Sequence, residues 1–169
     1  MTDILNEQFG QIYDKYISKI YRFVYIKVES EETAQDITSK VFLKGWEAFK
    51  GQKDTIKNPG AFLYQIARNA VVDHYRAKGR LKEISTDASP EMVDPRADAQ
   101  DQAILSADIN AIKKSINKLD PEYQDIIIWH YLDDMPIADI AKLIDRPDGT
   151  VRVMLHRGLK DLRGLVQEA

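Results

Sequence analysis

The hydrophobic positions in the first half of the chain repeat at helical spacing. Apolar side chains three and four residues apart predict a helix over residues 10–28, because that spacing places them on one face. Ser30, with Thr33 as the other candidate, has the chemistry to cap a second helix, which the pattern ends at Gly51. A third helix is expected to begin at Pro59, since proline is favoured at the first helical position. No stretch alternates apolar and polar positions for long enough to predict a strand.

The helical pattern disappears over residues 85–102 and then resumes. The interrupting segment is polar, acidic and contains two prolines, which is typical of a linker. Helical spacing returns after residue 104, Asp120 is expected to cap a further helix, and shorter helices follow at residues 137–144 and about 149–166. The sequence therefore predicts an all-α protein of two small helical domains. These are an N-terminal helical bundle and a C-terminal helix-turn-helix domain, joined by a flexible acidic linker.

Composition narrows the class of protein. The chain has 169 residues, of which 44% are hydrophobic, so packed cores are expected. It has no cysteine, which excludes disulfides, zinc ribbons and thiol nucleophiles. No apolar run approaches the roughly 20 residues of a membrane-spanning helix, and the N-terminus lacks the layout of a signal peptide. We therefore expect a cytoplasmic protein with no membrane insertion.

Charge is unevenly distributed along the chain. The formal net charge is −3, and residues 81–110 carry seven Asp and Glu against two Lys and Arg. Residues 1–80, by contrast, carry 13 basic and 10 acidic side chains. An acidic total argues against a protein that coats nucleic acid unaided, because nonspecific affinity comes mainly from neutralising phosphates. A chain with an acidic total can still carry local basic faces.

The sequence contains no recognisable catalytic or metal-binding arrangement. His74, His130 and His156 are scattered, and none has a partner at metal-ligand spacing. Neither a phosphate-binding glycine loop nor a nucleophile elbow occurs. We expect no enzyme activity, no metal and no cofactor.

The last two predicted helices form a compact motif. Only residues 145–148 separate them, so they predict a helix-turn-helix, whose second helix can enter the major groove of DNA. Polar and basic side chains surround the apolar stripe of that second helix: Thr150, Arg152, His156, Arg157, Lys160 and Arg163. Spacing and charge alone fit an antiparallel helical hairpin with a solvated basic face equally well.

A more specific pattern runs through the second half of the chain. It consists of residues 119–125, 131–135, 139–141, 149–152 and 155–163. Together these segments resemble the C-terminal domain of bacterial sigma factors of the extracytoplasmic-function (ECF) type, which reads the minus-thirty-five promoter element with its second helix. The resemblance assigns that contact to Thr150, Arg152, His156, Arg157 and Lys160.

Two departures from this family pattern affect the expected contacts. Asp145 stands where the family usually has a turn glycine, and Val153-Met154 stands where it often has a serine and a basic residue. Base reading depends on such side chains, whereas phosphate contacts do not carry sequence information. These departures therefore affect phosphate contacts least. We expect such contacts from Arg152, Arg157 and Lys160.

Residues 36–46 combine an apolar stripe with polar positions on another helical face. On spacing alone the apolar members fit a helix core: Ile37, Val41, Phe42 and Trp46. With Ala34, the segment resembles the part of sigma factors that grips the clamp helices of RNA polymerase. The resemblance implies a polymerase-facing side made of Asp36, Ser39, Lys40, Leu43 and Lys44. Family members often have a glutamine and an acidic residue in place of Ser39-Lys40.

Residues 58–76 resemble the ECF element that opens and reads the minus-ten promoter region. Melted bases need stacking surfaces and a cationic groove, and the polar loop at 51–57 is expected to hold a flipped base. The minus-ten contacts are assigned to Lys53, Asn58, Tyr64, Arg68, Asn69, Asp73, His74, Tyr75, Arg76 and Arg80. Asn69 and Asp73 share a helical face and are the expected polar readers. On the residues alone, without the resemblance, Asp73 would be an ordinary partner of Arg76 or Lys78 within the same helix.

The resemblance covers residues 9–80 and 105–165. It implies a sigma region-2 domain at 1–84, an acidic linker at 85–103 and a region-4 domain at 104–169. The implied partners are RNA polymerase core, promoter DNA and an anti-sigma factor.

Core binding is expected through residues 31–49, on the clamp helices of the largest subunit, and through parts of 119–135, on the flap of the second subunit. Two other interpretations remain open at the level of the sequence. One is a stand-alone helix-turn-helix regulator of duplex DNA. The other is a sigma-like protein that acts only through protein contacts.

Overall fold

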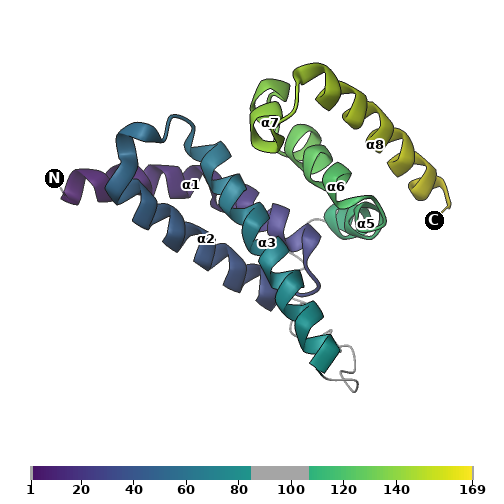
Figure 1. Cartoon of the computed structure of the whole chain (residues 1–169), viewed down its shortest axis with the longest axis horizontal. Coiled ribbons are helices and arrows are strands. Elements are labelled where there is room, and N and C mark those ends of the chain that lie inside the picture. Colours follow the sequence, from purple (N-terminus) through teal and green to yellow (C-terminus); the bar gives the residue numbers. More distant parts are fainter. Residues whose placement is uncertain (1, 85–106, 169) are drawn as a thin grey trace. The chain divides into compact units, whose positions relative to one another are not determined.

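The structure is a computed structural model that describes residues 2–84 and 107–168 (Figure 1). These ranges hold helices and short connections, without a strand, and the chain divides into two compact units, Met1–Ala99 and Gln100–Ala169. The predicted all-α architecture with two domains is therefore confirmed. The acidic linker predicted at 85–103 lies outside the described residues.

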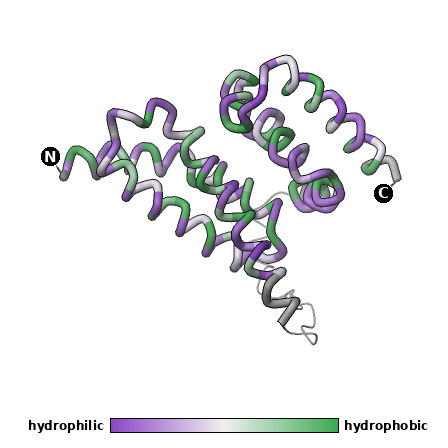
Figure 2. The backbone as a smooth tube through the Cα atoms, in the orientation of Figure 1, coloured by the Kyte–Doolittle hydropathy of each residue, from purple (hydrophilic) through white to green (hydrophobic). Residues whose placement is uncertain are grey.

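The first unit is a bundle of three helices, α1 (Thr2–Lys27), α2 (Glu31–Gln52) and α3 (Pro59–Ile84), each of which packs against the other two. A short 3-10 turn, η1 (Lys53–Thr55), follows α2. Hydrophobic positions recur along all three helices between hydrophilic ones (Figure 2). The large side chains that are fully buried in this unit are Ile20, Phe23, Val24, Ile26, Val28, Val41 and Leu63.

The first helix begins earlier than the apolar pattern predicts. α1 starts at Thr2 rather than near residue 10. Phe9 gives the reason, because its ring lies 5.3 Å from that of Trp46 and 5.6 Å from that of Phe49, measured between centroids. Phe9 thus packs the additional N-terminal turns of α1 against α2.

Side-chain caps fix the start of α2 and α3. The Thr33 backbone N–H donates to Ser30 Oγ at 3.1 Å, so Ser30, rather than Thr33, is the N-cap of α2. The Ala61 N–H donates to Asn58 Oδ1 at 3.1 Å, and Pro59 is the first residue of α3. Gly60 follows because a Cβ there would lie 2.6 Å from ring atoms of Tyr16. The glycine lets the start of α3 lie directly against α1.

The second unit contains α5 (Ala107–Ile116), α6 (Pro121–Ile127), α7 (Ile137–Ile144) and α8 (Asp148–Glu168). α5, α6 and α7 all contact α8. Trp129 is completely buried and is the largest of the side chains in this core. The other fully buried side chains of the unit are Ile116, Ile126, Ile128, Ile140 and Val151.

The helix that begins at Pro121 continues into a π-helical turn, which the spacing of apolar residues does not predict. A π-helical turn, η2 (Ile128–Leu132), continues α6, and the Asp133 N–H reaches the Ile128 carbonyl at 3.1 Å. At its other end Asp120 occupies the N-cap position, but its side chain makes no capping hydrogen bond. The capping role predicted for the Asp120 side chain is therefore wrong, and proline at the first position fixes the helix start.

The turn between α7 and α8 depends on a left-handed residue. Asp145 has φ 55° and ψ 53°, and the Arg146 N–H donates to the Ala141 carbonyl at 3.0 Å. Glycine is the usual residue in this conformation, but a short polar side chain such as aspartate also tolerates it. The missing turn glycine thus leaves the helix-turn-helix geometry intact. Gly158 brings α8 close to α6, because a Cβ there would lie 2.9 Å from Ile127 Cδ1.

Candidate nucleic-acid and polymerase interfaces

α8 has one buried face and one charged, exposed face. Val151, Met154 and Leu155 are buried. Met154 therefore belongs to the core, whereas Leu159 and Leu162, further along the helix, are only half-buried. The residues predicted to meet the minus-thirty-five element lie away from this core. Arg152, His156, Arg157 and Lys160 are exposed, and Thr150 is half-buried at the start of the helix.

An ion pair that the sequence did not reveal connects the turn of this motif to α6. Arg146 Nη2 lies 3.0 Å from Glu122 Oε1, and both side chains remain partly exposed. Its free energy is small because water screens it. It nevertheless fixes where the turn before α8 lies relative to α6.

The outward face of α2 matches the predicted polymerase-facing side. All five of its residues are exposed: Asp36, Ser39, Lys40, Leu43 and Lys44. Leu43 is 58% exposed, whereas its neighbour Phe42 is buried in the bundle. Lys40 Nζ pairs with Asp36 Oδ2 at 3.1 Å across one helical turn, and solvent reaches both groups.

A groove of about 850 Å³ runs between α2 and α3 and joins the two predicted sites. From α2 it is lined by polymerase-facing residues, Asp36 and Lys40 among them, and from α3 by Asp73 and His74. The fold thus places the clamp-binding candidates next to part of the minus-ten candidates, although their sequence positions are more than 30 apart.

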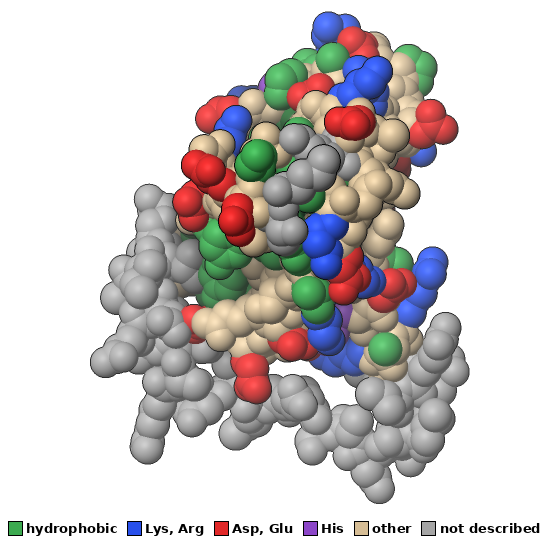
Figure 3. Space-filling view, turned by 90° about the vertical axis from the view of Figure 1, so that its left-hand side faces the viewer, with side chains coloured by type: hydrophobic (Ala, Val, Ile, Leu, Met, Phe, Trp, Pro, Cys, Tyr) green, Lys and Arg blue, Asp and Glu red, His purple; other side chains and the backbone are tan. Residues whose placement is uncertain are grey.

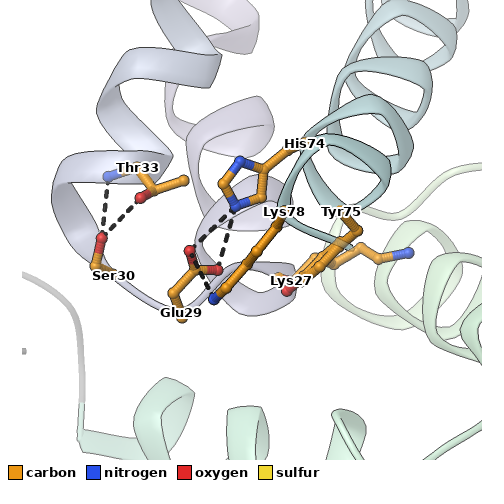
Figure 4. Close-up of polar contacts among 7 residues, drawn as sticks. All are labelled: Lys27, Glu29, Ser30, Thr33, His74, Tyr75 and Lys78. Atoms are coloured by element: carbon orange, nitrogen blue, oxygen red, sulfur yellow. Dashed lines mark hydrogen bonds and ion pairs between the residues drawn. The ribbon is translucent and has the colours of Figure 1, made fainter. Parts of the chain in front are cut away.

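His74 belongs to a polar cluster that connects α3 to the α1–α2 loop (Figure 4). Its Nε2 atom lies 3.1 Å from Glu29 Oε1, and Lys78 Nζ lies 3.4 Å from the same oxygen. Tyr75, beside it, donates its hydroxyl to the Lys27 backbone carbonyl. These contacts give His74 and Lys78 a positioning role at the loop that precedes α2. Burial raises the pKa of the Tyr75 hydroxyl, and the Glu29 carboxylate adds to this effect.

The Glu29 carboxylate has a pKa below its ordinary value of 4.5. Burial acts in the opposite direction, but a hydrogen bond from its own backbone N–H and the contacts with His74 and Lys78 outweigh it. A lowered pKa means that the carboxylate stabilises the folded unit at pH values above 4.5. This contribution is lost as the pH falls through the folded-state pKa.

Glu29→Gln is therefore expected to lower the stability of the first unit by about 0.5–1 kcal/mol at pH 7. Urea denaturation of the full chain at several pH values tests this. The difference between wild type and variant should shrink as the pH falls below 4.5. A difference that grows in acid would contradict the assigned contacts. Glu32→Gln, on an exposed side chain of α2, is the matched control.

Tyr64 does not supply a stacking surface. It is only 2% exposed, and its ring packs edge-on against Phe23 of α1, with 5.8 Å between centroids. The structure therefore corrects its assignment as a minus-ten residue, because a base cannot reach this ring. Tyr75, at 44% exposed, is the aromatic candidate that stays accessible on α3.

The other minus-ten candidates fall into two groups. Asn69, Asp73 and Arg76 are exposed along α3, and Asn69 Oδ1 accepts a hydrogen bond from Gln65 at 3.4 Å. Arg68 is half-buried, and Asn58 uses its side chain as the α3 cap. Lys78, the alternative intrahelical partner of Asp73, pairs with Glu29 instead. The side chains of Lys53 and Arg80 lie outside the described part of the structure.

Neither a metal centre nor a membrane-spanning segment is found in the described ranges. No three His, Asp or Glu side chains within 2–84 and 107–168 are grouped so that they could hold a metal ion. None of the helices described there is long and apolar enough to cross a bilayer.

Each unit matches a protein family. Residues 12–81 match Sigma-70 region 2, and residues 109–162 match Sigma-70, region 4. The curated relatives are consistent with these matches. The ECF RNA polymerase sigma factor BldN of Streptomyces coelicolor is 25% identical over 96% of this chain, which spans 61% of that protein. The ECF RNA polymerase sigma factor SigW of Bacillus subtilis is 27% identical over 93% of this chain and 88% of its own length.

Solved structures agree on the fold. The sigma factor RpoE of Bartonella quintana, in complex with the anti-sigma factor NepR, aligns with a TM-score of 0.76 at 22% identity and covers 95% of this chain and 98% of its own. CnrH in complex with the cytosolic domain of CnrY aligns with a TM-score of 0.69 at 17% identity, covering 96% and 90% of the two chains. With both family regions present in order and ECF relatives along nearly its whole length, the chain belongs to the sigma-70 family and is an ECF sigma factor.

Proposed function

We propose that this sigma factor binds RNA polymerase core through the outward face of α2 and directs transcription from specific promoters. The observation that carries the proposal is Leu43, which is 58% exposed among the charges of that face. An apolar side chain surrounded by charged ones is suited to the centre of a protein interface with a polar rim. The clamp helices of the largest polymerase subunit are its proposed partner.

The flap of the second polymerase subunit is the proposed partner of the second unit. Within the proposed segment, 119–135, Tyr131 is 47% exposed at the π-helical turn, while Trp129 beside it is completely buried. Tyrosine is enriched at the centres of interfaces because it combines a large apolar ring with a hydrogen-bonding group. An exposed tyrosine on this turn therefore supports contact with protein.

Promoter DNA is the proposed ligand of α3 and α8. Exposed Asn69, Asp73 and Arg76 on α3 supply groups for the minus-ten element, and α8 supplies Arg152 and Arg157 for the minus-thirty-five. On the face that Figure 3 draws, Lys and Arg are interspersed with Asp and Glu. This mixture favours DNA binding guided by polymerase over coating of nucleic acid by the free chain.

An anti-sigma factor is a further proposed partner. The sigma factor RpoE was solved in complex with the anti-sigma factor NepR, and the structurally similar CnrH was solved with the cytosolic domain of CnrY. A stand-alone helix-turn-helix regulator would explain α8 but would leave the exposed face of α2 without a role. The two family regions favour the sigma factor over this alternative.

Arg157→Ala tests the assignment of α8. Because Arg157 is exposed and positioned to meet a phosphate, its loss should weaken promoter binding similarly across sequences. The slope of log affinity against log salt should fall by about one. Filter binding of the reconstituted holoenzyme to promoter fragments at several salt concentrations measures both quantities. An unchanged slope would remove Arg157 from the DNA-facing side.

A further inference from the structure

The exposed face of α8 has an apolar side chain at its centre. Successive residues of a helix turn by about 100°, so Val153 points almost directly away from the buried pair Val151 and Leu155. It is 48% exposed. Among the described residues of α8, Val153 is the only large hydrophobic side chain exposed to this degree. Packing within the second unit therefore does not account for it.

Polar and basic side chains follow Val153 along this face. His156 and Arg157 lie three and four residues after it, and Lys160 lies seven after it, so all three share its side of the helix. All of them are exposed. Gly149 lies four residues before Val153, and a Cβ built there meets no atom within 4 Å. The face thus offers one apolar contact, followed by an imidazole and two cations, Arg157 and Lys160, and preceded by open space.

The ligand that fits this arrangement is the major groove of DNA. Its rims are phosphates, which the basic side chains can meet, and its floor presents one apolar group, the C5-methyl of thymine. Valine has no hydrogen-bonding group in its side chain, so it cannot read the polar edges of a base. It can, however, pack against a methyl group.

We propose that Val153 is a specificity-determining residue that packs against the C5-methyl of one thymine in the minus-thirty-five element. The proposal rests on the proposed function, in which α8 enters the major groove at that element. It assigns base selection to a position where the family often has a serine.

Uracil substitution provides the test, because deoxyuridine pairs like thymidine but lacks the methyl. The assay measures affinity of the reconstituted holoenzyme for a promoter fragment that it transcribes. Each thymine of the minus-thirty-five region, on both strands, is replaced in turn. Wild type should lose about three- to ten-fold in affinity at one position, the worth of a buried methyl contact. Val153→Ala should show no loss at that position.

Two further variants separate this contact from the rest of the interface. Arg157→Ala should keep the sensitivity to uracil while its salt dependence falls. Val153→Thr, of similar shape, should keep part of the sensitivity, since it retains one methyl. Since Val153 is exposed, both of its variants should keep the wild-type circular dichroism spectrum and melting temperature.

Wild-type binding that ignores every uracil substitution would overturn the proposal, and so would Val153→Ala retaining the wild-type pattern. Failure of the underlying function would look different. In that case wild-type holoenzyme would bind natural promoter DNA and scrambled minus-thirty-five DNA equally well.

Discussion

Replacing Leu43 by aspartate is expected to weaken the association of this sigma factor with RNA polymerase core by at least about thirty-fold. We expect Leu43 to be a hot spot of the interface, and truncating a hot-spot side chain costs about 2 kcal/mol or more, which corresponds to that factor. A carboxylate at the same place adds the cost of burying an unpaired charge. Because Leu43 is 58% exposed, the first unit itself should stay as stable as in wild type. Fluorescence anisotropy of labelled chain titrated with sigma-free core measures the affinity.

Ile4 offers a matched control for this experiment. It is also 58% exposed but lies on α1, outside the proposed polymerase-facing side. Ile4→Asp should bind core like wild type. If the two variants lose affinity equally, or if Leu43→Asp binds normally, the face of α2 is not the polymerase-binding surface.

Trp129→Ala is expected to unfold the second unit. The side chain is completely buried, and truncating a large core aromatic costs about 3–5 kcal/mol. A domain of this size has little stability beyond that amount. Far-ultraviolet circular dichroism of the full chain at 25 °C should therefore lose the helical signal of the second unit.

Tryptophan fluorescence allows the first unit to be followed separately in this variant. The chain has two, Trp46 in the first unit and Trp129 in the second. In Trp129→Ala, the remaining Trp46 fluorescence reports the first unit alone, and its melting transition should match that of wild type. Trp129→Phe, which keeps much of the volume, should show a smaller loss of helicity. A Trp46 transition that shifts together with the loss of the second unit would show that the two units are not independent.

Local chemistry made much of the fold predictable from the sequence. Ser30 and Asn58 cap helices through hydrogen bonds to backbone groups three residues away, so a short pattern reveals them. The exposed face of α2 was predictable for a similar reason. Ile37 and Val41 point into the bundle, which leaves Leu43 outside.

Contacts between distant segments explain what the sequence did not reveal. Tyr64 is buried with its ring packed against Phe23, a residue on another helix, α1. Glu29 and His74 are 45 residues apart, so no local pattern predicts their contact. The π-helical turn at residues 128–132, which carries the buried Trp129, likewise follows no periodic signal in the sequence.

The most direct test of the central claim is association of the purified chain with sigma-free RNA polymerase core, followed by transcription from a library of genomic fragments. We expect a stable complex that starts transcription at sites which core alone does not use. Those sites should share minus-ten and minus-thirty-five sequences. A chain that binds promoter DNA alone but shows no affinity for core would contradict the account and support a stand-alone regulator instead.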